Sequence, residues 1–118
     1  MCGRMTLTQP SLAKVAEELS AAVRPQDQPL YRPRYNVAPS DLHWIAVAPE
    51  AAVPRYQCTL VPARWGFRRG ESMLVNARGE GLLHPRGALG RALAERRCIV
   101  PADGFFEWTG PKKTRQPL

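Results

Sequence analysis

Apolar positions along the chain switch between alternating and helical spacing. Residues 2–7 alternate enough to form a short strand. After Pro10 and Ser11, apolar residues follow the helical period, which predicts one amphipathic helix whose apolar stripe packs in the core. The members of that stripe are Leu12, Val15, Ala16, Leu19 and Val23.

Strands are expected next. Residues 42–48 are rich in β-branched and aromatic side chains and predict a strand. A further strand is expected where Tyr56, Cys58 and Leu60 alternate with polar residues, which would place Cys58 in the core and Thr59 toward solvent. Between the helix and these strands, prolines at 25, 29 and 33 mark a connector, and residues 35–40 have the composition of a turn.

The second half of the chain is more polar. Asn76, Arg78 and Glu80 would share one face if the chain is extended there. A helix is expected over 85–97, with Leu89, Ala92 and Leu93 inward. An apolar strand start at 98–100, a turn at 102–104, a strand at 105–108, a hairpin loop at 109–115 and a returning strand at 116–118 complete the pattern. Short elements interrupted by 12 prolines argue against a helical bundle and favour a mixed α/β (α+β) fold.

The composition suits one small globular domain, residues 1–118, with 44% hydrophobic and 23% charged residues. The formal net charge of +7 points to a polyanionic partner, nucleic acid first, although a solvated basic surface with no partner would give the same number. The 3 cysteines form no CxxC pair, so neither a metal site nor a cofactor is expected, and the odd count without a signal peptide favours the cytoplasm. No apolar run is long enough to span a membrane.

The start of the chain offers specific chemistry. Cys2 follows the initiator methionine, which is usually trimmed ahead of small residues. Trimming would leave an amine with an ordinary pKa of about 7.7–8.0 beside a thiol of about 8.5. The amine can attack an aldehyde to give an imine, and the thiolate can close on the imine carbon as a thiazolidine. An apolar residue near a frayed terminus is the plainer interpretation of Cys2 alone.

Glu107 is the second candidate, because aromatic residues flank it on both sides. It either faces solvent by strand alternation or is a carboxyl with a raised pKa. His43 and His84 fall outside any motif and are expected at the surface.

Five segments in order resemble the SOS-response-associated peptidase family, also called abasic-site processing proteins. They are Met1-Cys2-Gly3-Arg4, residues 34–39 (Arg-Tyr-Asn-Val-Ala-Pro), Trp65-Gly66-Phe67, residues 76–80 (Asn-Ala-Arg-x-Glu) and residues 97–108 (Arg-Cys-Ile-Val-Pro-Ala-Asp-Gly-Phe-Phe-Glu-Trp). The resemblance implies a compact α/β domain on a curved, barrel-like sheet. It also implies single-stranded DNA with abasic sites as the partner, and association with the nucleoid during DNA damage.

The resemblance further implies a role for each matching residue. Cys2 would be the nucleophile that captures the abasic aldehyde, Asn76 would hold the Cys2 terminus or the sugar, and Glu107 would be the general acid/base. Contacts to DNA would come from Arg4, Asn36, Pro39 and Arg78. Removal of the chain's own Met1, abasic-site lyase activity and reversal of the crosslink are also implied.

Two departures from the family pattern qualify this expectation. The family's further histidine, in a His-x-Arg-Met-Pro-like segment, does not occur in the 118 residues, which we interpret as the N-terminal part of a longer domain. Arginines follow Phe67 where relatives often carry aromatic wedge residues. The main alternative is therefore an inert remnant that binds single-stranded DNA by charge, or binds nothing. A general N-terminal-nucleophile peptidase is the third.

Overall fold

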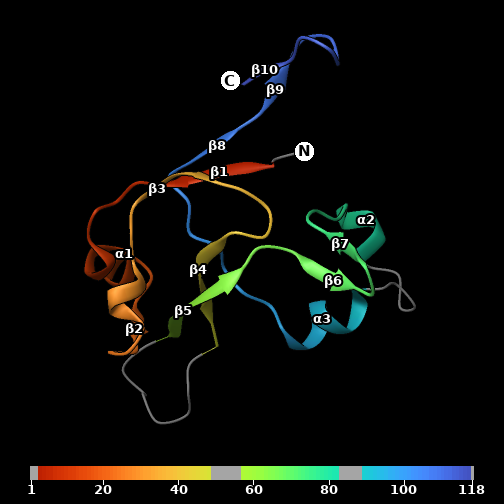
Figure 1. Cartoon of the computed structure of the whole chain (residues 1–118). Helices are drawn as coiled ribbons and strands as arrows, with labels where there is room; N and C mark the ends of the chain where they lie inside the picture. The colour runs from red at the N-terminus through yellow and green to blue at the C-terminus, as the bar shows by residue number, and fades with distance from the viewer. Residues whose placement is uncertain (1–2, 49–56, 83–88, 118) are drawn as a thin grey trace.

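A computed structural model describes residues 3–48, 57–82 and 89–117 (Figure 1). Two three-stranded sheets form its frame. In the first, β1 (Arg4–Leu7) lies between β3 (Arg34–Val37) and β8 (Gly104–Phe106), with both pairings antiparallel. In the second, β5 (Cys58–Arg64) lies between β2 (Ala21–Val23), which runs parallel to it, and the antiparallel β4 (Leu42–Val47).

The remaining elements are short. Two antiparallel hairpins are formed by β6 (Phe67–Arg69) with β7 (Ser72–Leu74) and by β9 (Trp108–Thr109) with β10 (Gln116–Pro117). The helices are α1 (Leu12–Glu18), the 3-10 turn η1 (Gln28–Leu30), α2 (Gly79–Leu82) and α3 (Gly90–Glu95). The mixed α/β class is confirmed, and the described strands do not close into a barrel. In the described part of the chain, no helix has the length and apolar character needed to cross a bilayer.

Helix α1 begins where the sequence predicts. The Ser11 hydroxyl accepts a hydrogen bond from the Lys14 backbone N–H at 3.4 Å, as an N-cap residue does. The predicted helix is wrong at its end, because Val23 belongs to β2. Ser20 adopts φ 48°, a left-handed conformation that stops the helix and turns the chain into the sheet.

The core lies between α1 and the β2–β5–β4 sheet. Val15 and Ala16 of α1 pack against a cluster that includes Trp44 and Leu60. Cys58 is half-buried against this cluster, as predicted, and its thiol donates to the Leu19 carbonyl at 3.4 Å. The predicted exposure of Thr59 is wrong, since its side chain is buried. Its neighbour Leu60 is buried as well, and because successive strand residues point to opposite faces, both faces of β5 are covered at this point.

Other predictions for the second half are also corrected. Helix α3 has no buried residue, and Leu93 is exposed rather than inward. Leu89 is half-buried, and the start of the predicted helix at 85–88 lies outside the described residues. Asn76 and Arg78 lie in irregular chain while Glu80 is in α2, so the three do not follow one strand. The strand predicted at 105–108 is broken at Glu107, between β8 and β9.

Asp103, directly before β8, holds the end of β1 through several hydrogen bonds. Its carboxylate accepts hydrogen bonds from the Thr6 hydroxyl at 2.6 Å, from the Thr8 hydroxyl at 2.8 Å and backbone N–H, and from the Gln9 N–H at 3.2 Å. Its own N–H donates to the Thr6 carbonyl at 3.0 Å. Burial opposes ionisation of Asp103, but the Thr6 and Thr8 hydrogen bonds outweigh it and lower its pKa. Asp103 therefore fixes the register of β1 against β8.

The β9–β10 hairpin continues from β8 and projects away from the two sheets (Figure 1). The radius of gyration is 16.0 Å, against about 13.5 Å expected for a compact domain of this length. The described start of the chain lies beside β8 at the base of this projection (Figure 1).

Candidate nucleic-acid interface and active site

The pairing of β1 with β3 brings two of the predicted DNA-contacting residues together. Met5 is the partner of Val37, and the register then shifts so that Leu7 faces Arg34. The extra residue on β3 forms a bulge. Tyr35 and Asn36 are consequently both exposed, although neighbouring strand residues normally face opposite ways. Asn36 thus lies in a bulged strand and not in the predicted turn, next to the strand that carries Arg4.

The turn itself follows at residues 38–41. Asp41 closes it by accepting from the Ala38 N–H at 3.0 Å and from the Arg34 guanidinium at 2.7 Å. The Ala38 hydrogen bond lowers the pKa of Asp41 most, burial opposes it, and the charge and hydrogen bond of Arg34 and then the charge of Arg4 lower it further. Since Met5 pairs with Val37, the preceding Arg4 lies beside Ala38, at the start of the turn that holds Pro39. Three predicted DNA-contacting residues therefore gather at one place.

A chain of hydrogen bonds extends from this turn to Asn76. The Ser40 N–H donates to the Trp65 carbonyl at 2.8 Å, and the Trp65 N–H donates to the Asp41 carbonyl at 3.0 Å. The Trp65 indole N–H then donates to the Val75 carbonyl at 3.0 Å, one residue before Asn76. The three central sequence motifs, at 34–39, 65–67 and 76–80, are thereby one connected structure.

Gly66 allows the close approach of these segments. Its φ is +124°, a conformation that favours glycine, and a Cβ there would lie 2.6 Å from the Met73 sulfur. Met73 in turn accepts a hydrogen bond from the Ser40 hydroxyl at 3.4 Å. The absence of a side chain at residue 66 therefore lets Met73 of the β6–β7 hairpin lie against the turn.

Asn76 lines a cavity of about 430 Å³ with mostly apolar walls from β1, β4, β5 and the segment before β8. The wall contributed by β1 is Met5, directly after Arg4. Arg64 and Cys98 also line this cavity. Cys98 is an exposed free thiol that sequence reasoning left without a role, and only its place in the 97–108 motif could have drawn attention to it.

The predicted surface position of His43 is wrong. His43 is 4% exposed and lines the Asn76 cavity. Its Nε2 lies 2.8 Å from the Pro101 carbonyl, which can only accept, so Nε2 carries the proton and donates. Burial lowers the pKa of His43, partly offset by the Pro101 hydrogen bond, and the Arg34 charge lowers it further. His43 therefore joins β4 to the chain leading into β8 as a neutral side chain. His84 lies outside the described residues.

Glu107 is reached through the β1–β8 ladder. Arg4 is the partner of Phe106 and Met5 of Phe105, so the N-terminal strand runs beside the residues that precede Glu107. Glu107 is half-buried, while Phe105 and Trp108 on either side are exposed. Glu107 is not among the residues that line the Asn76 cavity. Cys2 lies outside the described residues, and Arg78 is exposed on the segment between β7 and α2.

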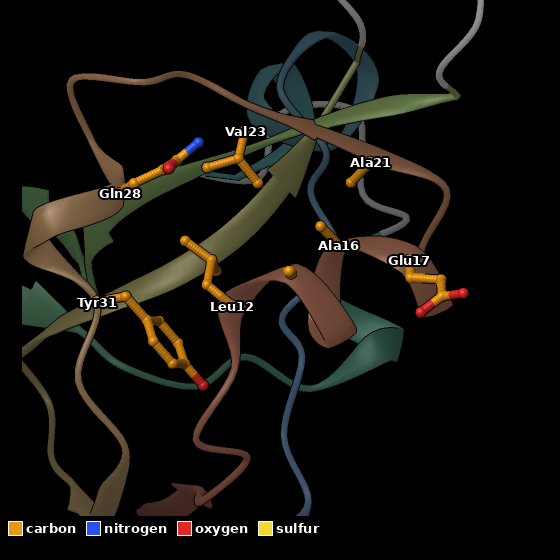
Figure 2. A pocket seen from close by; sticks show the side chains of 8 residues that line it. Leu12, Ala16, Glu17, Ala21, Val23, Gln28 and Tyr31 are labelled. Carbon is orange, nitrogen blue, oxygen red and sulfur yellow. The ribbon is translucent and has the colours of Figure 1, made fainter.

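A larger cavity, of about 680 Å³, lies elsewhere. Leu12 of α1, Val23 of β2 and Tyr31, directly after η1, line it (Figure 2). Glu17 is the acidic side chain at its edge, and none of the motif residues lines it. It is therefore not the site that the motifs build.

The net charge of +7 and the exposed strand that carries Asn36 agree with a domain that contacts a polyanion such as nucleic acid. The whole chain, residues 1–118, matches the SOS response associated peptidase (SRAP) family. The chain belongs to this family.

Curated relatives carry names that agree with the family. The chain is 32% identical over 127 residues to the abasic site processing protein YoaM of Bacillus subtilis (strain 168), covering 100% of this chain and 52% of YoaM. The abasic site processing protein YoqW of Bacillus phage SPbeta is 32% identical and covered to 53%, and YobE of Bacillus subtilis is 31% identical and covered to 54%; both matches include all of this chain. The chain thus spans about half the length of these relatives.

Proposed function

We propose that this chain processes abasic sites in single-stranded DNA by capturing the ring-opened sugar through Cys2. Family membership and the names of the relatives support abasic-site processing as the reaction class. The observation that carries the proposal is the chain of hydrogen bonds that joins the 38–41 turn, Trp65 and Val75, the residue before Asn76. Trp65 and Asn76 line the same cavity as Met5 of β1, the strand that begins two residues after Cys2.

The proposed reaction needs no redox partner. Hydrolysis of the Met1–Cys2 peptide bond frees the Cys2 amine. That amine attacks the C1′ aldehyde of the open sugar, and loss of water gives an imine. The thiol then adds its sulfur to the imine carbon while its proton passes to the nitrogen, closing a thiazolidine. Hydrolysis of the peptide bond consumes one molecule of water, and capture of the aldehyde releases one.

The other residues have proposed roles that their positions support. Two peptide units, each spanning at most about 3.6 Å, separate Arg4 from Cys2 in the chain, and Arg4 is the ladder partner of Phe106 beside Glu107. Glu107 would protonate the sugar oxygen as the ring opens. Asn76 would orient the sugar or the Cys2 terminus by hydrogen bonds. Arg4 and Arg78 would bind flanking phosphates, with Asn36 and Pro39 contacting the strand between them.

The test is a denaturing gel of the protein mixed with an abasic single-stranded oligonucleotide. The native protein should give a heat-stable slow band, and Cys2→Ser should give none. Cys98→Ser is the matched control, because it removes an exposed thiol that lines the Asn76 cavity and leaves Cys2 intact. A stable band of equal intensity with Cys2→Ser would refute the assignment.

A second candidate function is single-stranded DNA binding without chemistry. The separation of Glu107 from the residues that line the Asn76 cavity favours it. In that case the native protein would bind the abasic oligonucleotide in a native gel yet give no band under denaturing conditions. Cys2→Ser would then bind with unchanged affinity.

A further inference from the structure

The β9–β10 hairpin is a projecting element that neither the motifs nor the proposed chemistry uses. Its ladder pairs Thr109 with Gln116 and Trp108 with Pro117, and residues 110–115 form the connecting loop. Gly110 adopts φ +94° at the start of that loop. Figure 1 shows the hairpin extending beyond β8, at the end of the first sheet where the described chain begins.

The hairpin loop carries positive charge alone. Lys112, Lys113 and Arg115 are exposed, and residues 108–117 include no acidic side chain. The ion pairs found among the described residues join Arg24, Arg34 and Arg91 to carboxylates. None of these pairs involves the three cations of the hairpin loop. The charge at this loop is therefore available to a partner.

Aromatic side chains occupy the base of the same projection. Trp108 is 44% exposed and Phe105 is 67% exposed, a high fraction for such large apolar residues. An exposed aromatic ring beside a row of cations is the arrangement by which proteins hold single-stranded nucleic acid, since bases stack on the ring and phosphates pair with the cations. An acidic protein surface would use the cations but would leave Trp108 without a stacking partner.

We propose that the β9–β10 hairpin is a second DNA-contacting region, in which Lys112, Lys113 and Arg115 bind phosphates and Trp108 stacks on a base. It rests on the proposed function, because it extends the strand that would enter near Arg4 and Glu107. Only residues 109–111 lie between Trp108 and Lys112, so the stacking ring and the first cation are close together in the hairpin. The hairpin thus lengthens the bound strand beyond the lesion.

Salt dependence gives the sharpest test, because each phosphate neutralised on a single strand contributes about 0.7 to the slope of log affinity against log salt. Three contacts contribute about 2. Raising salt from 50 to 200 mM should therefore cost the native protein about 16-fold more affinity than the variant with Lys112, Lys113 and Arg115 all changed to Gln.

The experiment measures fluorescence anisotropy of an undamaged oligo-dT strand over this salt range. The matched control changes Lys14, Arg91 and Arg96 to Gln, which removes the same charge from α1 and the region of α3. The hairpin variant should lose a slope of about 2, and the control should lose less than 1. Equal loss of slope in both variants, or none in either, would overturn the proposal, as would a loss seen with duplex DNA and not with the single strand.

Trp108 is tested separately by replacement with Leu and with Phe. Loss of stacking should weaken binding at least fivefold in Trp108→Leu, and Trp108→Phe should keep most of the affinity. Equal weakening by both would contradict the stacking role. Crosslinking of all variants to abasic DNA at saturating concentration separates the two proposals: a hairpin variant that binds weakly yet still crosslinks supports both. If the hairpin variant changes the salt dependence of binding but the native protein forms no crosslink, only the proposed capture by Cys2 is refuted.

Discussion

Replacement of Asp103 is the most informative structural perturbation, since this residue fixes the β1–β8 register on which the proposed site depends. Asp103→Ala removes acceptors for three donor residues, Thr6, Thr8 and Gln9. Hydrogen bonds to a charged group each contribute about 1.5–3 kcal/mol when well buried. Asp103 is exposed and the bonds share one carboxylate, so we expect about 2–3 kcal/mol in total after solvent screening.

This loss converts into a measurable melting shift. For 118 residues the unfolding entropy is about 250 cal/mol/K, so each 1 kcal/mol corresponds to about 4 °C. Asp103→Ala should therefore lower Tm by about 8–12 °C, measured by circular dichroism. Asp103→Asn keeps one carbonyl acceptor and should lose about half as much.

The pH dependence tests the same interaction independently. Because the folded pKa of Asp103 lies below its ordinary value of 3.8, its contribution is present above that value and is lost as pH falls through the folded pKa. Asp41 titrates in the same window, so the difference between native protein and Asp103→Asn isolates Asp103. That difference should be full at neutral pH and shrink toward pH 2. A difference in Tm below about 1 °C at neutral pH would refute the role of Asp103 in fixing the β1–β8 register.

Two further predictions concern the cavity wall and the close approach at residue 66. His43 has a folded pKa below its ordinary 6.5, so the unfolded chain binds the extra proton and stability should fall as pH drops below about 6.5 toward the folded pKa. His43→Gln, which can still donate to Pro101, should flatten Tm against pH between 5 and 7.5, and an unchanged slope would argue against a buried neutral imidazole. Gly66→Ala should cost about 1–3 kcal/mol, read by urea titration, because its φ of +124° and the Met73 sulfur both oppose a Cβ; Gly70→Ala is the control, since its surroundings are open although its φ of +59° is strained too. Equal losses at the two positions would indicate backbone strain alone.

Local signals predicted the elements that depend on local chemistry. The Ser11 cap, the β4 strand and the hairpin at 109–117 all follow from side chains within a few residues of one another. The motifs also selected Arg4, Asn36 and Pro39, which the structure gathers at one turn. These predictions need no knowledge of distant partners.

The errors arose where distant partners decide the outcome. Asn36 was assigned to a turn because its composition suits one, but pairing with β1 makes a bulged strand. Thr59 alternates with apolar neighbours as a surface residue would, and His43 belongs to no motif, yet both are buried. The sequence around Asp103 predicts only a turn. Its hydrogen-bond partner Thr8 lies 95 positions away, so no local pattern could predict the contact.

Peptide mapping of the DNA-bound product tests the central claim most directly. After reaction with an abasic single strand and digestion of both components, mass spectrometry should find the sugar remnant on a peptide that begins at Cys2, with Met1 absent and one water lost. An adduct on a lysine or on Cys98, or a remnant on a peptide that still carries Met1, would contradict capture by the N-terminal amine and thiol.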